Sequence, residues 1–228
     1  MNKIAIIPAR GGSKRILNKN IYNLNGVPLI AHTVRQAIEF GDFDGIYVNS
    51  DSDEILDCAK EYGAIPYKRP SDLAIDVSRV LDVAKSQIKD MNLDKHDELA
   101  LLLPTCPLRT HEDIRQAYNI FSDHNKKKQV VSMTEYEKPP EQAFVIENGL
   151  LVRQFPDGYS SRSQDHLASY RYNTAIIIST MEIFLEQRDI VGDDSIPYIM
   201  PFERSIDIDY QYQMDMVECM MKNEKNTY

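Results

Sequence analysis

The sequence predicts an α/β fold built on a mostly parallel β-sheet that carries helices on both faces. Three observations indicate this class: short apolar runs rich in β-branched residues, amphipathic stretches between them, and glycine or capping signals at the ends of those stretches. A strand, a helix and a second strand in succession give parallel pairing and cover the sheet. The length of 228 residues fits one large domain better than two small ones.

Several apolar runs are short enough to be buried strands. They are residues 4–7, 46–48, 99–103, 130–133 and 175–178. The stretches between them have the periodicity of helices. One is expected to bury Leu29, Ile30, Val34, Ala37 and Ile38 and to stop at Gly41. A second ends before Gly63, and Thr110 with Asp113 resembles an acidic capping box at the start of a third.

The alternation of strands and helices lapses between about residues 135 and 172. Prolines and Gly158 punctuate short patterned pieces there. We therefore expect an insertion in the single domain, in the form of a small β-rich arm.

Composition excludes several classes of function. The formal net charge of −9 disfavours nucleic acid as a partner, so a bound anion needs a local basic cluster. No apolar run approaches the ~20 residues of a membrane span, and we expect a cytoplasmic protein with no membrane partner. The three cysteines are widely separated and predict neither a disulfide framework nor a zinc site.

A basic turn follows the first apolar run. It reads PARGGSKR over residues 8–15, and it places four positive charges within ten residues, at Arg10, Lys14, Arg15 and Lys19. Gly11 and Gly12 let backbone N–H groups approach a polyphosphate, and Ser13 adds a hydroxyl donor. The loop after the first strand lies at the edge of the sheet where ligands bind. A solvent-facing basic turn is the alternative, because the sequence is neither a P-loop nor a GxGxxG fingerprint.

A pair of acidic residues lies near the other end of the chain, in the segment Ser205-Ile206-Asp207-Ile208-Asp209. If this segment is extended, Asp207 and Asp209 point to one side and the isoleucines pack inward. Two clustered carboxylates repel each other unless a cation lies between them, and Mg²⁺ prefers one or two carboxylates together with phosphate oxygens and water. Alone, such a pair is more often a pair of surface carboxylates; together with the basic turn it predicts a metal site.

Two further sites remain ambiguous from the residues alone. Arg162 and Gln164 lie within the irregular region, where an arginine fork suits a carboxylate and an amide suits hydroxyl groups. A polar surface loop explains them equally well. Asp51 follows the apolar run that ends at Val48, and it is a helix N-terminal residue, a nucleotide contact, or both.

Several segments, which follow one another in the order typical of the family, together resemble the acylneuraminate cytidylyltransferases, the CMP-sialic acid synthetase family. They are IAIIPARGGSKRILNKN (4–20), NGVPLIAHT (25–33), VNSD (48–51), RPSDLA (69–74), LLLPTCPLR (101–109), RSQD (162–165) and SIDID (205–209). The resemblance covers nearly the whole chain. It implies a Rossmann-like nucleotidyltransferase fold whose projecting arm, about residues 135–172, makes a homodimer and helps to bind the sugar.

The resemblance also implies roles for individual residues. CTP phosphates would be held by Arg10, Ser13, Lys14 and Lys19, and the nucleoside by Asn20 and Arg69, with Gly11 and Asp51 also in the nucleotide site. Asp207 and Asp209 would bind Mg²⁺ or Mn²⁺. Arg162 and Gln164 would face the sugar across the subunit boundary. The expected catalytic residues are Arg10, Lys14, Lys19 and Arg162.

This chain departs from the family pattern mainly on the sugar side. Leu103 stands where the family has a glutamine that helps to bind the sugar, and Cys106 replaces a serine. The NGAIYI pattern reads NTAIII over residues 173–178, and a family lysine is missing around residues 140–142. Residues 76–80 also differ, within the part that contacts the base. A site built to bond a hydroxyl rejects ligands that lack it, so these changes predict the same reaction on an altered acidic sugar.

The predicted activity is transfer of CMP from CTP to an acidic nonulosonic sugar, with release of pyrophosphate. Two alternatives remain. The chain is a nucleotidyltransferase for another acidic sugar, such as an octulosonate, or for another nucleotide. Otherwise it is a regulatory protein that binds a nucleotide without turnover.

Overall fold

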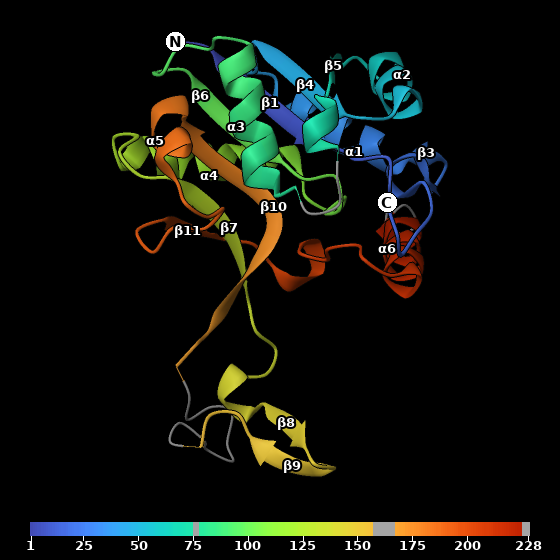
Figure 1. Ribbon diagram of the computed structural model, residues 1–228, viewed down its shortest axis with the longest axis vertical. Helices are drawn as coiled ribbons and strands as arrows, with labels where there is room; N and C mark the ends of the chain where they lie inside the picture. Colours follow the sequence, from blue (N-terminus) through green and yellow to red (C-terminus); the bar gives the residue numbers. More distant parts are fainter. Residues whose placement is uncertain (75–77, 157–166, 225–228) are drawn as a thin grey trace.

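The fold is an α/β sandwich around one sheet, as a computed structural model of residues 1–74, 78–156 and 167–224 shows (Figure 1). The sheet has seven strands in the order β11-β7-β10-β6-β1-β4-β5. Their bounds are β1 Lys3–Pro8, β4 Gly45–Ser50, β5 Ile65–Lys68, β6 Glu98–Leu102, β7 Val130–Glu135, β10 Tyr170–Thr180 and β11 Ile196–Ile199. All neighbours pair in parallel except β10, which runs antiparallel to both β6 and β7. The predicted mostly parallel sheet is confirmed.

Helices cover both faces of the sheet. One face carries α1 (Leu29–Phe40), α2 (Asp53–Glu61) and α4 (His111–Asp123), and the other carries α3 (Val80–Asp90) and α5 (Met181–Glu186). Successive residues of β1 divide between the two cores: Ala5 and Ile7 face the first, and Ile4 and Ile6 the second. This arrangement follows from the period of two along a strand.

A third, smaller core forms beneath the C-terminal helix α6 (Gln211–Glu224). Met214 and Val217 of α6 pack there against Ile16 and Leu24. The remaining elements are short: β2 (Asn23–Leu24), β3 (Val27–Pro28) and the 3₁₀ turns Lys19–Ile21, Ser71–Leu73, Pro140–Gln142 and Phe202–Arg204. None of the helices in the described ranges combines the length and the apolar character that a bilayer crossing requires.

The predicted helix boundary signals are confirmed, whereas one residue predicted to be buried is exposed. Gly41 ends α1 at a φ of 79°, a left-handed conformation that glycine adopts without strain. Thr110 and Asp113 form the capping box at the start of α4. Ile38 was expected on the buried face of α1 and is instead 45% exposed. It points away from the sheet and reaches over Gly63, where its Cδ1 lies 3.2 Å from the position that a Cβ would take.

The predicted β-rich arm region contains a hairpin that projects from the sheet (Figure 1). Its strands are β8 (Phe144–Glu147) and β9 (Leu150–Arg153), and within the described ranges they pair only with each other. Asn148 and Gly149 make the turn with φ values of 52° and 80°, as a tight hairpin requires. Extensions of β7 and β10 carry the hairpin away from the core.

The buried carboxylate of Asp113 ties α4 to the chain that leads into residues 205–209. It accepts hydrogen bonds from Arg204 Nη2 at 2.7 Å and from the Tyr198 hydroxyl at 2.8 Å. Burial alone would raise the pKa of Asp113, but the bonds from Arg204, Thr110 and Tyr198 outweigh it and lower that pKa below its ordinary value.

We predict that Asp113→Asn lowers the free energy of unfolding by about 2–4 kcal/mol at neutral pH, because it leaves Arg204 without its anion. A lowered pKa in the folded state means that this stabilisation is present above the unfolded pKa and is lost as the pH falls through the folded value. Urea titrations between pH 7 and pH 3 measure both effects. Asp123→Asn, an exposed change on the same helix, is the control; a constant difference between wild type and Asp113→Asn across this range would contradict the prediction.

Candidate functional site

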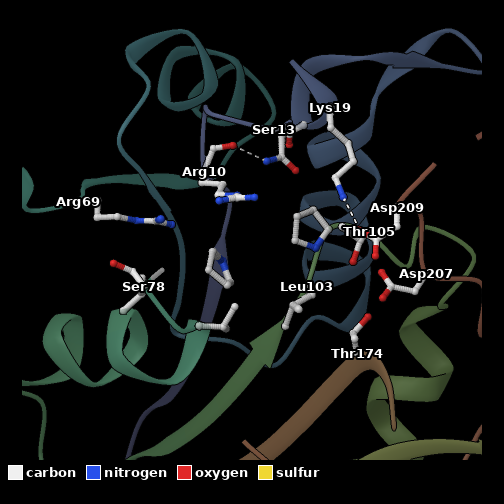
Figure 2. A pocket seen from close by; sticks show the side chains of 15 residues that line it. Arg10, Ser13, Lys19, Arg69, Ser78, Leu103, Thr105, Thr174, Asp207 and Asp209 are labelled. Carbon is white, nitrogen blue, oxygen red and sulfur yellow. Dashed lines mark hydrogen bonds and ion pairs between the residues drawn. The ribbon is translucent and has the colours of Figure 1, made fainter. Parts of the chain in front are cut away.

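A cavity of about 330 Å³ opens at the carboxyl ends of β1 and β6 (Figure 2). The chain leaves β1 for β4 and β5 on one side and returns to β6 on the other, and α1 and α3 lie on opposite faces. Ligands of open α/β sheets bind at such a topological switch point. The position of the cavity therefore follows from the order of the strands.

The basic turn forms one wall of the cavity. Arg10, Ser13, Lys19 and Asn20 all line it. Asn20 fixes the turn from behind, because its Nδ2 donates to the Arg10 carbonyl oxygen at 2.9 Å, and the side chain is only 4% exposed. Its Oδ1 is buried without a hydrogen-bond partner among the described residues. A ligand donor in the cavity would satisfy that oxygen.

Lys14 lies to one side, in an adjoining cavity of about 210 Å³. Arg10, Ser13, Lys19 and Asp209 line both spaces. Positive side chains thus line both of these neighbouring cavities, which together offer a path for an extended polyanion.

Gly11 and Asp51 do not line either cavity; they bond to each other. The Gly11 N–H donates to Asp51 Oδ1 at 2.9 Å, so this amide is already paired. A Cβ on Gly11 would lie 3.0 Å from Ser52 Cβ, which explains the need for glycine at this point. Asp51 is not the helix cap either: Ser52 caps α2 by accepting from the Ile55 N–H. In this arrangement the two residues position the turn.

The acidic pair lies opposite the basic turn. Asp207 and Asp209 both line the larger cavity, while Ile206 and Ile208 are buried in the core beneath α6. The predicted alternation is therefore present although the segment forms no sheet strand. Its register is fixed by a hydrogen bond from the Ile208 N–H to the Thr105 carbonyl oxygen, at 2.8 Å.

Lys19 joins the basic turn to the acidic pair. Its Nζ donates to the Ile208 carbonyl oxygen at 2.7 Å and lies 3.4 Å from Asp209 Oδ1 (Figure 2). Arg15 Nη1 lies 2.8 Å from the other oxygen of Asp209. Two segments that are far apart in sequence thus form one site of mixed charge.

The carboxyl group of Asp207 lacks full compensation for its charge. Burial raises the pKa of Asp207, and the neighbouring charge of Asp209 raises it further, against the opposing effects of the Thr105 hydroxyl, Lys19 and the Thr174 hydroxyl. A divalent cation between the two aspartates would remove this penalty. The described residues hold no cluster of three or more His, Cys, Asp or Glu side chains, so phosphate oxygens and water would complete the coordination. The pair fits Mg²⁺ in this respect.

Arg69 lines the far end of the cavity and is 7% exposed. Its Nε donates to Asn49 Oδ1 at 2.8 Å, and Asn49 Nδ2 donates to Gln87 Oε1 at 2.9 Å. Burial lowers the pKa of Arg69, the charge of Asp51 raises it and that of Arg10 lowers it. Sequence reasoning missed Asn49 and Gln87, because nothing in the local pattern indicates that β4 and α3 meet behind Arg69.

Leu103 lies in the cavity wall just beyond the end of β6. Thr105 and Thr174 also line the cavity. They were not predicted as site residues from the sequence, although they lie in residues 101–109 and 173–178, two segments that were set beside the family pattern. Ser78, Val80 and Val83 complete the wall next to Arg69. Arg162 and Gln164 lie outside the described residues.

Comparison with known proteins identifies the family. The family model described as cytidylyltransferase matches residues 4–220. The chain belongs to the cytidylyltransferase family. It is 33% identical to the pseudaminic acid cytidylyltransferase of Campylobacter jejuni subsp. jejuni serotype O:23/36, over 97% of each chain. It is 34% identical to the CMP-N,N'-diacetyllegionaminic acid synthase of Legionella pneumophila, also over 97% of each chain.

One further relative and one solved structure also match this chain. The N-acylneuraminate cytidylyltransferase of Escherichia coli O18:K1:H7 is 32% identical over 98% of this chain and 52% of that protein. A structure of CMP:2-keto-3-deoxy-manno-octonic acid synthetase complexed with CTP matches 98% of this chain and 100% of that one, with a TM-score of 0.74 at 13% identity. The first relative confirms the family that the sequence resembles, and the second confirms the nucleotidyltransferase fold.

We predict that Gly11→Ala lowers the free energy of unfolding by about 1–2 kcal/mol, because its Cβ would press against Ser52. Gly12→Ala is the matched control, since nothing lies within 4 Å of its added Cβ, and it should stay within about 0.5 kcal/mol of wild type. Urea denaturation without nucleotide measures both variants. Equal stabilities of the two variants would show that the close approach at Gly11 has no energetic consequence.

Proposed function

We propose that this protein is a cytoplasmic, magnesium-dependent enzyme that joins CTP to an acidic nonulosonic sugar, giving a CMP-sugar and pyrophosphate. The observation that carries the proposal is the meeting of a basic turn and a pair of aspartates in one cavity, where Lys19 of the basic side bonds the Ile208 carbonyl oxygen and Asp209. The named activities of the relatives support the choice of CTP and of the sugar class.

The triphosphate would lie along the basic turn. Arg10, Ser13 and Lys19 line the larger cavity, and Lys14 lines the adjoining one, so the β- and γ-phosphates can extend from the first space into the second. These cations would offset the charge that grows on pyrophosphate as it leaves. Arg69 and the unpaired Oδ1 of Asn20 would contact the nucleoside part.

Asp207 and Asp209 would hold Mg²⁺, or Mn²⁺ in its place, against the α-phosphate. The ion would supply Lewis-acid polarisation of phosphate oxygens. The anomeric hydroxyl of the sugar attacks the α-phosphorus in line and loses its proton to water, while the bond from that phosphorus to the bridging oxygen breaks and the electron pair leaves with pyrophosphate. Arg15 and Lys19 keep Asp209 oriented toward the cavity.

The sugar would differ from N-acylneuraminate in the groups that approach β6. Leu103 presents an apolar side chain at the cavity wall and has no hydrogen-bonding group to offer a sugar hydroxyl or amide. The relatives that act on pseudaminic and diacetyllegionaminic acids are consistent with such a change. We therefore propose a modified nonulosonic acid as the substrate.

Incubation of the enzyme with Mg²⁺, one nucleotide (CTP, UTP, GTP or ATP) and one acid of the neuraminic, legionaminic or pseudaminic type tests the function. We expect pyrophosphate release with CTP alone among the nucleotides. Asp209→Ala should reduce turnover by a factor of about 10³ or more, because it removes a metal ligand, and should leave the thermal midpoint near that of wild type. Asp215→Ala, an exposed change on α6, is the control. Near-normal turnover by Asp209→Ala with Mg²⁺ would remove the metal role.

The arm would make a homodimer. Ile146, Leu150 and Leu151 of the hairpin are 76%, 70% and 72% exposed, and an isolated two-stranded hairpin is marginally stable. A second copy of the chain would cover these side chains. In such a dimer Arg162 and Gln164 of one subunit would approach the sugar bound to the other.

We predict that Leu151→Asp converts the dimer to a monomer in light scattering after size exclusion, because it places a charge in the apolar contact. Met216→Asp on α6 is the control, since this residue is 48% exposed and α6 lies away from the hairpin (Figure 1). A dimer that survives Leu151→Asp unchanged would place the interface elsewhere.

A further inference from the structure

Thr174 adopts a backbone conformation that β-branched residues avoid. Its φ is 62°, and it lies where the pairing register of β10 with β7 shifts, between Tyr172 and Ile177. The other non-glycine residues with positive φ in the described ranges are five asparagines and Lys126. Asparagine tolerates this region, whereas the branched Cβ of threonine crowds the backbone. The strain is therefore specific to this position.

The Thr174 side chain also carries an unsatisfied polar group. It lines the cavity and points toward Asp207 and Thr105 (Figure 2). Its Oγ1 favours the ionised form of Asp207, yet it is buried and makes no hydrogen bond of normal geometry with any described residue. A buried hydroxyl without a hydrogen-bond partner destabilises the folded protein, and a ligand that bonds to it offsets this cost.

The residues that flank Thr174 fix its position. Asn173 Oδ1 accepts from Ser132 Oγ at 2.6 Å and from the Ala175 N–H at 3.2 Å. The Ala175 carbonyl oxygen accepts from the buried Arg109 Nη1 at 2.6 Å. A strained backbone conformation persists where the surrounding contacts hold it in place. Such strained residues cluster at ligand-binding sites. Glycine would remove both the strain and the unpaired hydroxyl, so the presence of threonine requires a reason.

The geometry of in-line displacement indicates that Thr174 faces the sugar. Pyrophosphate leaves toward Arg10, Lys14 and Lys19, so the attacking hydroxyl must approach from the opposite side of the α-phosphorus. Leu103 and Thr174 line the part of the cavity next to Asp207, away from Arg69 (Figure 2). Leu103 offers no hydrogen bond there. The hydroxyls of Thr105 and Thr174 both favour the ionised form of Asp207, and of the two it is Thr174 Oγ1 that is buried without a hydrogen-bond partner among the described residues. Thr174 therefore has the polar side chain best placed to meet the sugar.

We propose that Thr174 is a specificity-determining residue whose hydroxyl hydrogen-bonds an oxygen of the acidic sugar beside its attacking hydroxyl. This role rests on the proposed function. It predicts that the strained backbone at Thr174 serves to aim the hydroxyl into the cavity. It also predicts that the nucleotide is bound without help from Thr174.

Three variants separate the hydroxyl from the backbone. Thr174→Val keeps the branched shape and removes the hydroxyl, and it should lower kcat/KM for the sugar by a factor of about 10–100 while the KM for CTP stays within about twofold. Thr174→Ser keeps the hydroxyl and should retain most of the activity. Thr174→Gly should lose sugar kcat/KM as Thr174→Val does, with a melting temperature equal to or above that of wild type, because the strain is relieved.

Several outcomes would overturn this role. One is a Thr174→Val variant with the sugar kcat/KM of wild type; another is a loss that appears in the KM for CTP instead of in the sugar kcat/KM. A fall in the melting temperature of Thr174→Gly would make Thr174 a structural residue. Full turnover by Thr174→Val defeats this role and leaves the proposed function intact. A wild-type protein that neither turns over nor is thermally stabilised by any acid of the panel defeats both.

Discussion

The site depends on one interaction, the contact of the Lys19 ammonium with the segment that carries the two aspartates. Lys19 Nζ bonds the Ile208 carbonyl oxygen and lies beside Asp209, and its side chain is only 13% exposed. In a protein of net charge −9, two carboxylates next to a cavity would repel an anionic ligand. Lys19 and Arg15 reverse that local field on the side that faces the basic turn. The same contact holds together segments that lie at opposite ends of the chain.

Three contacts with neighbouring residues fix the backbone of the basic turn. Asp51 binds the Gly11 amide, Asn20 binds the Arg10 carbonyl group, and Ser52 packs so closely against Gly11 that an added Cβ would have to displace it. None of these contacts needs a ligand. Because the backbone of the turn is fixed before binding, no backbone ordering is needed when a phosphate arrives, and preorganisation of this kind favours electrostatic stabilisation.

Sequence predicted the central strands and the two charged segments, because these carry strong local signals. The edge strands β5 and β11 were missed; each contains a proline, Pro66 or Pro197, which weakens a strand pattern and is tolerated only at the edge of a sheet. Asp207 and Asp209 were predictable since alternation persists without sheet pairing. The Gly11–Asp51 bond and the support of Arg69 by Asn49 were not predictable, because each depends on contacts between elements that meet only after folding.

Several unfavourable features converge on the cavity. Asp207 is a buried carboxyl with a raised pKa, Arg69 is a buried cation with a lowered one, and Thr174 combines a strained backbone with an unpaired hydroxyl. Outside the cavity, the buried carboxylate of Asp113 is paired by Arg204 and Tyr198. A cation, a phosphate and a polyhydroxylated acid would each relieve one of these penalties. The free energy that these groups withhold from folding is thereby available to ligand binding.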